Sequence, residues 1–256
     1  GWHRLRAVVE GVEGEAVTTL VVTPQRLELP PALAHRRAWG LMTQVYQLRS
    51  AFSYGVGDLG DLAALATFGG AELGADWVLV NPLHAAQATP PMEASPYLPT
   101  TRRFVNPIYI RVEDLPEIAY LDAATRARVA EVAATGHALN DGATIDRDAS
   151  WAAKRAALEL VYAAGRSPRR QRAFDGFCVR EGQGLVDFAT WCALTDVHGQ
   201  SWREWPQELH RPDSPAVAQF RDASEAAVDF FRWFEWVLGD QLAATQRLAK
   251  EAGMRL

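Results

Sequence analysis

The chain has 256 residues, of which 48% are hydrophobic and 22% are charged, and its formal net charge is −5. This composition is ordinary for a globular protein with a sizeable core. The acidic balance argues against a protein that binds nucleic acid, which requires a basic surface. No apolar run is long enough to span a membrane and no signal peptide is visible, so we expect no membrane association.

The two cysteines, Cys178 and Cys192, both occur in apolar segments with helical spacing. They offer neither a disulfide framework nor a metal-binding spacing, so we expect buried, reduced thiols and no metal site. Reduced thiols and the lack of a visible signal peptide predict a cytoplasmic protein.

The first thirty residues predict β-structure. Trp2–Val9 and Ala16–Thr23 have strand-like patterns, and Gly11 to Gly14 supply a turn between them. Two strands are rarely stable alone, so we expect them to belong to a larger sheet. Because the chain starts at Gly1, without Met and inside a strand pattern, we expect it to be a piece of a longer protein.

A strand–helix–strand unit is predicted next. Residues 39–48 form a mostly apolar run typical of a buried strand, and Asp58 is a suitable N-cap for a following helix. The apolar face of that helix is predicted to contain Leu59, Leu62, Ala66 and Leu73. Gly74 would end the helix, and residues 77–80 would form a parallel strand buried on both faces.

The pattern becomes helical after residue 121. The predicted helices cover residues 123–134, 148–164, 168–180, 185–197 and 226–252. The last is apolar nearly all round between Phe230 and Leu238, which predicts burial on several sides. Residues 202–206 and 211–215 are predicted to be irregular connectors, and Met254–Leu256 resemble the start of another strand.

The segment from Ser95 to Ile110 carries the clearest functional signal. It begins as a loop rich in proline and hydroxyl groups, with an aromatic ring at Tyr97, and ends in a strand-like apolar run. A tyrosine can stack on the C–H face of a sugar and hydrogen-bond through its phenol. On residue types alone, an ordered proline-rich turn is favoured over a sugar-binding loop.

Other candidate sites are weaker. The loop Gly55–Asp58 lies where phosphate loops occur but lacks their full motifs, so a structural turn with an N-cap is favoured over a phosphate site. His84 follows a strand end, and a hydrogen-bonded loop histidine is favoured over a metal ligand. His137, His198 and His210 are predicted at the surface.

Two charged groups are predicted to have no catalytic role. Glu204 and Glu208 are four residues apart, but Pro206 interrupts the helix that would place them on one face. Arg169, Arg170 and Arg172 are predicted to form a solvated helix face. No Ser/His/Asp arrangement is visible.

Several motifs resemble amylomaltases (4-alpha-glucanotransferases, glycoside hydrolase family 77). Residues 39–48 resemble the first barrel strand of that family, 54–59 the following loop and helix start, and 81–83 the end of the second strand. The run 95–110 resembles the family's Ser-Pro-Tyr…Arg-Arg-Phe segment. Residues 202–206 and the aromatic helix before Gly253 resemble parts of its helical insertion and of the helix that enters strand three.

The resemblance implies an α/β fold: an incomplete (β/α)8 barrel with its first two strands and a large helical insertion, preceded by the end of a β-sandwich domain. The implied boundaries place the β domain at 1–36, the first barrel strands and sugar loop at 37–121, the insertion at 122–252 and the start of strand three at 253–256. Oligomeric state is not implied.

The implied activity is retaining transfer of α-1,4-glucan segments between maltodextrins, without metal or organic cofactor. It uses a carboxylate nucleophile and a carboxylic acid/base. Those carboxylates lie on later strands, so no catalytic residue is expected in this segment, which alone would be inactive. Ser95 and Tyr97 map to the family's sugar site, and Met92 replaces a Tyr of some members. The alternatives are a non-catalytic glucan-binding fragment, a degenerate relative or a structural remnant without ligand.

Overall fold

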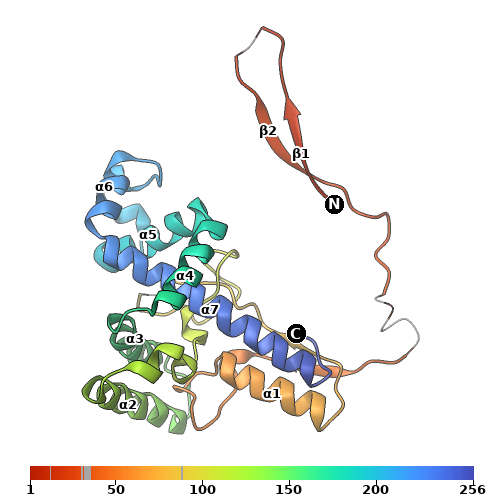
Figure 1. Cartoon of the computed structure of the whole chain (residues 1–256), viewed down its shortest axis with the longest axis vertical. Helices are drawn as coiled ribbons and strands as arrows, with labels where there is room; N and C mark the ends of the chain where they lie inside the picture. Colours follow the sequence, from red (N-terminus) through yellow and green to blue (C-terminus); the bar gives the residue numbers. More distant parts are fainter. Residues whose placement is uncertain (12, 30, 32–35, 88) are drawn as a thin grey trace. The chain divides into compact units, whose positions relative to one another are not determined.

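The computed structural model describes residues 1–256 except 12, 30, 32–35 and 88. The chain forms two compact units, residues 1–38 and residues 39–256 (Figure 1). The domain boundaries that the resemblance implies remain predictions.

The first unit contains an antiparallel hairpin. Strand β1 (Trp2–Ala7) pairs with β2 (Ala16–Val21), with Trp2 opposite Val21 and Ala7 opposite Ala16. Gly11 and Gly14 have φ angles of +82° and +108°, which glycine adopts without steric cost. The two strands are therefore as predicted, and all their residues are exposed. Within the described residues they pair only with each other, so the larger sheet expected for them is not formed in this chain.

The second unit begins with the predicted strand–helix–strand unit. Strand β3 (Gly40–Thr43), helix α1 (Leu59–Ala71) and strand β4 (Trp77–Val80) follow in order, and β3 pairs with β4 in parallel. The Asp58 side chain caps α1 by accepting from the backbone N–H groups of Gly60 and Asp61. Gly74, at φ +68°, ends the helix as predicted.

Two features of this unit differ from the prediction. The first strand is shorter than residues 39–48, because the backbone turns into a 3₁₀ helix, η1 (Val45–Gln47), where the Val45 N–H donates to Asn81 Oδ1 at 2.7 Å. Leu73, predicted on the apolar face of α1, is 46% exposed because it lies in the turn after the helix.

Residues near the end of the chain extend the sheet. Val78 N–H donates to the carbonyl oxygen of Arg255 at 2.8 Å, and Arg255 N–H donates to that of Asp76 at 3.1 Å. A parallel bridge between Trp77 and Arg255 results. One face of the sheet is covered, with Val78 3% exposed, whereas Met42 and Leu79 on the other face are 80% and 56% exposed. The prediction that β4 is buried on both faces is therefore wrong for this chain.

Helices dominate the remainder. They are α2 (Ala123–Ala138), α3 (Arg147–Ala163), α4 (Pro168–Glu181), α5 (Gln183–His198), α6 (Pro215–Ala223) and α7 (Glu225–Glu251). The five predicted helices are confirmed, with α2 longer than expected. Helix α6 was not predicted. Ser214 caps it, and Pro215 occupies its first turn, where a backbone N–H would have no acceptor within the helix and its absence costs nothing.

The predicted strand-like run before Ile110 is wrong. Residues Pro107–Tyr109 form a 3₁₀ helix, η2, which the side chain of Asn106 caps by accepting from Ile108 N–H at 3.0 Å. Two further 3₁₀ helices follow, η3 (Val112–Asp114) and η4 (Pro116–Tyr120). The apolar residues of this run are buried in the core and do not pair in a sheet.

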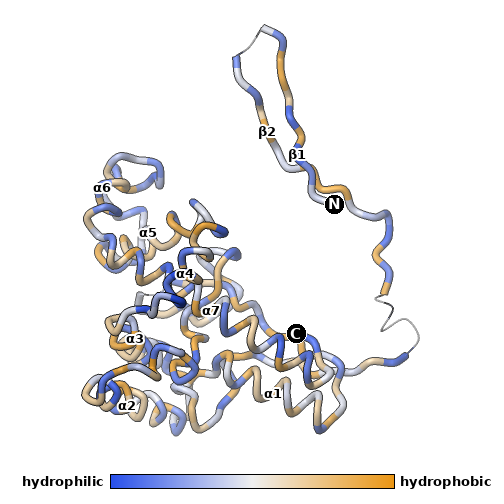
Figure 2. The backbone as a smooth tube through the Cα atoms, viewed as in Figure 1, coloured by the Kyte–Doolittle hydropathy of each residue, from blue (hydrophilic) through white to orange (hydrophobic). Residues whose placement is uncertain are grey.

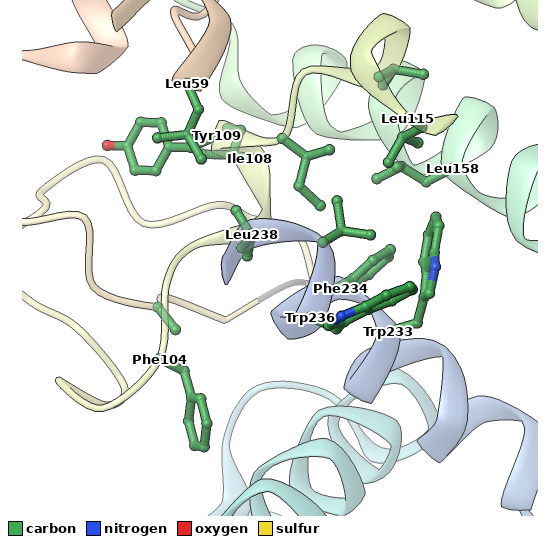
Figure 3. Close-up of a cluster of buried hydrophobic side chains, with 14 of the residues drawn as sticks. Leu59, Phe104, Ile108, Tyr109, Leu115, Leu158, Trp233, Phe234, Trp236 and Leu238 are labelled. Carbon is green, nitrogen blue, oxygen red and sulfur yellow. The ribbon is translucent and has the colours of Figure 1, made fainter. Parts of the chain in front are cut away.

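Helix α7 is the centre of the core (Figure 3). Its rings Trp233, Phe234 and Trp236 are at most 3% exposed and lie among side chains from α1, η2 and α3. The hydropathy colouring shows apolar positions of α7 interspersed with polar ones toward its C-terminal end (Figure 2). The predicted burial of this helix on several sides is confirmed.

Several side chains are more buried than predicted. Arg170 of α4 donates to Glu117 and Asp240 and stacks on Trp236, while its neighbours Arg169 and Arg172 are exposed as expected. Both cysteines are free, and the predicted burial is confirmed for Cys192, where it raises the pKa of the thiol. Cys178 is only half-buried, which is less than predicted.

Over the part of the chain that the structure describes, none of the helices combines the length and apolar character required to cross a membrane.

Candidate functional site

The segment after β4 folds back on itself. His84 and Val105 form an antiparallel bridge, and Ala85 N–H donates to the carbonyl oxygen of Phe104 at 2.8 Å. The carbonyl oxygen of Ala85 also accepts from Thr100 N–H at 2.9 Å. These bonds close the base of the loop that contains Ser95 and hold it at the carboxyl end of β4, where parallel α/β folds bind ligands.

A small pocket opens beside this loop, with an enclosed volume of only about 20 Å³. Its lining combines aromatic, hydroxyl, amide, imidazole and guanidinium groups. These groups belong to Tyr46, His84, Ser95, Asn106, Tyr109 and Arg147. Such a mixture provides both a ring face and several hydrogen-bonding groups, as a polyhydroxylated ligand requires.

Ser95 is the predicted site residue that lines this pocket. It is half-buried, and its N–H donates to Glu93 Oε1 at 2.7 Å. Its Oγ accepts from Tyr97 N–H at 3.3 Å, and its carbonyl oxygen accepts from Leu98 N–H at 3.2 Å. The turn uses the hydroxyl as an acceptor and leaves its O–H available as a donor.

Tyr97, the other predicted site residue, has a different position. Its side chain is 64% exposed, and it is not among the residues that line the pocket. The structure therefore places Ser95 in the cavity and the Tyr97 ring at the surface of the same loop.

The wall opposite the loop is built around Tyr109. This residue is buried, and burial raises the pKa of its phenol, which accordingly remains a protonated donor. Its oxygen lies 3.4 Å from Asn81 Nδ2. Nearby, the guanidinium of Arg147 lies 5.1 Å from the centre of the Tyr46 ring, in a cation–π arrangement.

The histidines fall into different environments. His84 lines the pocket, and within the described residues no group of three or more His, Cys, Asp and Glu side chains could hold a metal ion. His198 is exposed as predicted. The surface prediction is only partly right for His137 and His210, which are both half-buried. His137 Nε2 lies 3.1 Å from Glu113 Oε1, and His210 Nε2 lies 2.9 Å from the carbonyl oxygen of Trp205.

The glycine loop before α1 is a structural turn. Residues 54–58 are buried, and Arg111 donates from Nε to both carboxylate oxygens of Asp58 at 2.8 and 2.9 Å. Arg111 Nη2 lies 2.6 Å from Asp61 Oδ1. A phosphate would meet two buried carboxylates here, so the geometry supports the structural reading over the phosphate site.

Lys154 of α3 completes this buried cluster. Its Nζ donates to the carbonyl oxygens of Ile108 and Ile110 at 2.7 and 2.8 Å and to Asp58 Oδ2 at 3.2 Å. Burial lowers the pKa of Lys154, although Asp58 opposes that change. The cluster connects α1, η2 and α3 behind the pocket.

Sequence reasoning did not assign Tyr46, Asn106, Tyr109 or Arg147 to the site. The first three lie within the motifs discussed above, where the local pattern indicated strands. A site could have been suspected only because these residues follow the strands β3 and β4 in the sequence. Arg147 is the first residue of α3 and has no local signal. Glu204 and Glu208 are exposed on separate 3₁₀ turns, consistent with the prediction that they share no helix face.

Comparison with known proteins identifies relatives. The family model described as 4-alpha-glucanotransferase (Glyco_hydro_77) matches residues 43–256. A 4-alpha-glucanotransferase from Mycobacterium tuberculosis strain H37Rv is 49% identical, and the match covers 100% of this chain and 36% of the relative. One from Haemophilus influenzae is 29% identical over 93% of this chain and 36% of its own length. The chain spans about a third of the length of these curated relatives.

Solved structures agree in fold. Amylomaltase from Corynebacterium glutamicum superposes with a TM-score of 0.79 at 41% identity, covering 99% of this chain and 34% of that structure. Amylomaltase from Streptococcus agalactiae, in complex with acarbose, gives a TM-score of 0.69 at 18% identity over 86% of this chain and 42% of that structure. At that identity the second likeness concerns the fold alone.

Proposed function

This chain belongs to the 4-alpha-glucanotransferase family, glycoside hydrolase family 77, and we propose that it acts within an enzyme that moves α-1,4-glucan segments between maltodextrins. The observation that carries the proposal is the family match over residues 43–256, which includes the whole pocket at Ser95. We further propose that the enzyme works in the cytoplasm.

The finer architecture is part of the proposal. We assign β3, β4 and the segment at Arg255 to the first three strands of a (β/α)8 barrel. The parallel order of these segments supports this assignment, and so does the apolar face that carries exposed Met42 and Leu79, since residues of that face would point into a closed barrel. We assign the hairpin β1–β2 to a β-sandwich domain.

In this proposal the glucose next to the reacting bond lies over the mouth of this pocket, whose enclosed volume of about 20 Å³ is too small to take in a sugar ring. Ser95 would donate its O–H to a sugar hydroxyl, and the exposed ring of Tyr97 would stack on the sugar from the rim. Tyr109 and Arg147 would hydrogen-bond from the opposite wall. Their role is orientation, which lowers the entropic cost of bringing donor and acceptor chains together.

Retaining transfer requires two carboxyl groups about 5–5.5 Å apart, one as nucleophile and one as acid and base. Among the lining residues, all of which the structure describes, Glu93 is the one carboxylate, and its Oε1 accepts from Ser95 N–H. We therefore propose that this chain binds sugar and that carboxylates outside it perform the chemistry.

The alternative is a glucan-binding protein without transferase activity. The pocket at Ser95 lacks a pair of carboxylates, which favours this alternative for the chain in isolation. Incubation with maltotriose, followed by separation of the products, tests both readings. We expect this chain alone to leave maltotriose unchanged. A protein that contains this chain and has the full length of its family relatives should produce shorter and longer maltodextrins. Products from this chain alone would contradict the assignment of the chemistry, and an inactive full-length protein would favour the alternative.

A further inference from the structure

A second, larger pocket lies between α5 and the segment that runs through the 3₁₀ helices η6 (Trp202–Glu204) and η7 (Gln207–Leu209) into α6. Its volume is about 380 Å³, within the range of pockets that hold small ligands. None of the roles assigned above uses this pocket. Its lining includes tryptophan rings together with threonine, aspartate and histidine side chains.

The wall of the pocket is a row of aromatic rings. Phe104 stacks on Phe188 with 4.6 Å between ring centres, Phe188 lies parallel to Trp191 at 6.2 Å, and Trp191 lies 6.4 Å from Trp205. Trp205 is 5% exposed, and its Nε1 donates to the carbonyl oxygen of Gly199 at 2.8 Å. This hydrogen bond fixes Trp205, and the members of the row that line the cavity are Phe188, Trp191 and Trp205.

The rim carries a more accessible ring. Trp202 is 41% exposed and meets His210 edge to face, with 5.3 Å between ring centres. His210 is in turn fixed by its contact with the carbonyl oxygen of Trp205 at 2.9 Å. A ligand that enters the pocket would thus meet one exposed indole and two inner ones.

Polar groups line the same pocket. Asp187 accepts from Gln183 Nε2 through Oδ1 at 2.7 Å, which leaves Oδ2 for another donor. Thr100 and Thr101 line the same cavity and belong to the loop that carries Ser95. A lining that combines aromatic rings with hydroxyl and carboxylate groups suits a sugar, which has C–H faces and several hydroxyl groups, better than a purely apolar partner.

We propose that this aromatic pocket is a second binding site for an α-1,4-glucan, separate from the pocket at Ser95. The inference rests on the proposed function, because the two pockets flank one loop. Thr100 is five positions after Ser95, so their Cα atoms are at most about 18 Å apart. A chain held in the second pocket would raise the local concentration of glucan at the first.

The test is titration of the ¹⁵N-labelled chain with maltoheptaose, followed by NMR. Indole signals of Trp191, Trp202 and Trp205 report on the second pocket, and backbone signals of residues 95–97 report on the first. Trp202→Ala should weaken binding at the second pocket about tenfold or more, since a stacking ring is lost. Trp2→Ala removes an equally large ring that is 79% exposed in the other unit and is the matched control.

The inner polar group provides a second variant. Asp187→Asn keeps the size of the side chain. It should weaken glucan binding at the second pocket, as followed by the indole signals, without altering the melting curve. Cellohexaose, a β-1,4-linked chain, is the control ligand and should bind at least tenfold more weakly.

The outcomes separate the two proposals. Shifts of the Trp191 and Trp205 indole signals that need about tenfold more maltoheptaose in Trp202→Ala, but not in Trp2→Ala, support the second site, whether or not residues 95–97 respond. Shifts confined to residues 95–97 would overturn the second site while supporting the role of the first pocket. Silent indole signals with either ligand, or equal binding of cellohexaose, would also overturn it.

Discussion

The Nζ atom of Lys154 lies 3.2 Å from Oδ2 of Asp58, and both side chains are fully buried. The two residues are 96 positions apart in the sequence. Their contact joins the N-terminus of α1 to α3.

Replacement of Lys154 by methionine should therefore be strongly destabilising. The variant leaves Asp58 buried with one of its two cations removed, and loss of one partner of a buried ion pair costs about 3–5 kcal/mol. The free energy of unfolding, followed by tryptophan fluorescence in urea, measures this loss. Lys250→Met, at an exposed position on α7, is the control and should change stability by less than about 0.5 kcal/mol. Equal effects of the two variants would contradict the structural role of the pair.

The carboxyl group of Glu235 predicts a dependence of stability on pH. Burial raises its pKa from 4.5 to about 8, although a hydrogen bond from Val105 N–H at 3.2 Å opposes this. Between these pH values the folded chain keeps a proton that the unfolded chain releases. The contribution of Glu235 is therefore greatest below pH 4.5 and is lost as the pH rises to about 8.

Glu235→Gln should remove that part of the pH dependence. The urea midpoints of the parent and the variant, measured near both ends of this window, give the difference directly. Glu251→Gln, on the exposed face of the same helix, should retain the parental slope. A Glu235→Gln slope equal to that of the parent would show that Glu235 is ionised in the folded chain.

Two helix glycines should respond oppositely to alanine. A Cβ atom at Gly136 of α2 would lie 2.1 Å from a ring carbon of Tyr54, whereas one at Gly176 of α4 would meet nothing within 4 Å. We expect Gly136→Ala to destabilise by about 1–3 kcal/mol through overpacking. Gly176→Ala should stabilise by about 0.5–1 kcal/mol, because alanine favours helix. Melting temperatures that move in the same direction would contradict the close packing of Tyr54 on α2.

Tyr97→Ala tests the sugar-stacking role. Because this ring is 64% exposed, its removal should change the free energy of unfolding by less than about 0.5 kcal/mol. In a full-length enzyme that contains this chain, turnover with maltotriose should fall about tenfold or more. Tyr120→Ala, at a 46% exposed position outside the loop, is the control and should retain activity. Parental kinetics in Tyr97→Ala would exclude the assigned role.

Local signals predicted the elements but not the contacts between them. Asp58 and Gly74 marked the ends of α1, and the apolar runs marked β4 and α7. Helix α6 was missed because Pro215 resembles a loop residue unless its position in the first helical turn is known. The apolar run before Ile110 was misjudged because burial in a 3₁₀ turn and in a strand require similar side chains.

The candidate site shows the same limit. Ser95 was predicted from its motif and does line the pocket. Arg147 reaches the same pocket from the start of α3, a position fixed by how α2 and α3 pack, and no local pattern records it. His137 and Arg170 looked like surface residues because their partners, Glu113 and Glu117, are distant in sequence.

The open face of the β3–β4 sheet has a chemical consequence. Of the three methionines, Met42 on this face is 80% exposed, whereas Met92 and Met254 are 8% and 0% exposed. Mild peroxide should therefore oxidise the Met42 thioether first, since access of the oxidant to sulfur limits that reaction. The mass of the peptide that contains Met42 thus reports whether other protein covers this face, because a covered thioether would keep its original mass.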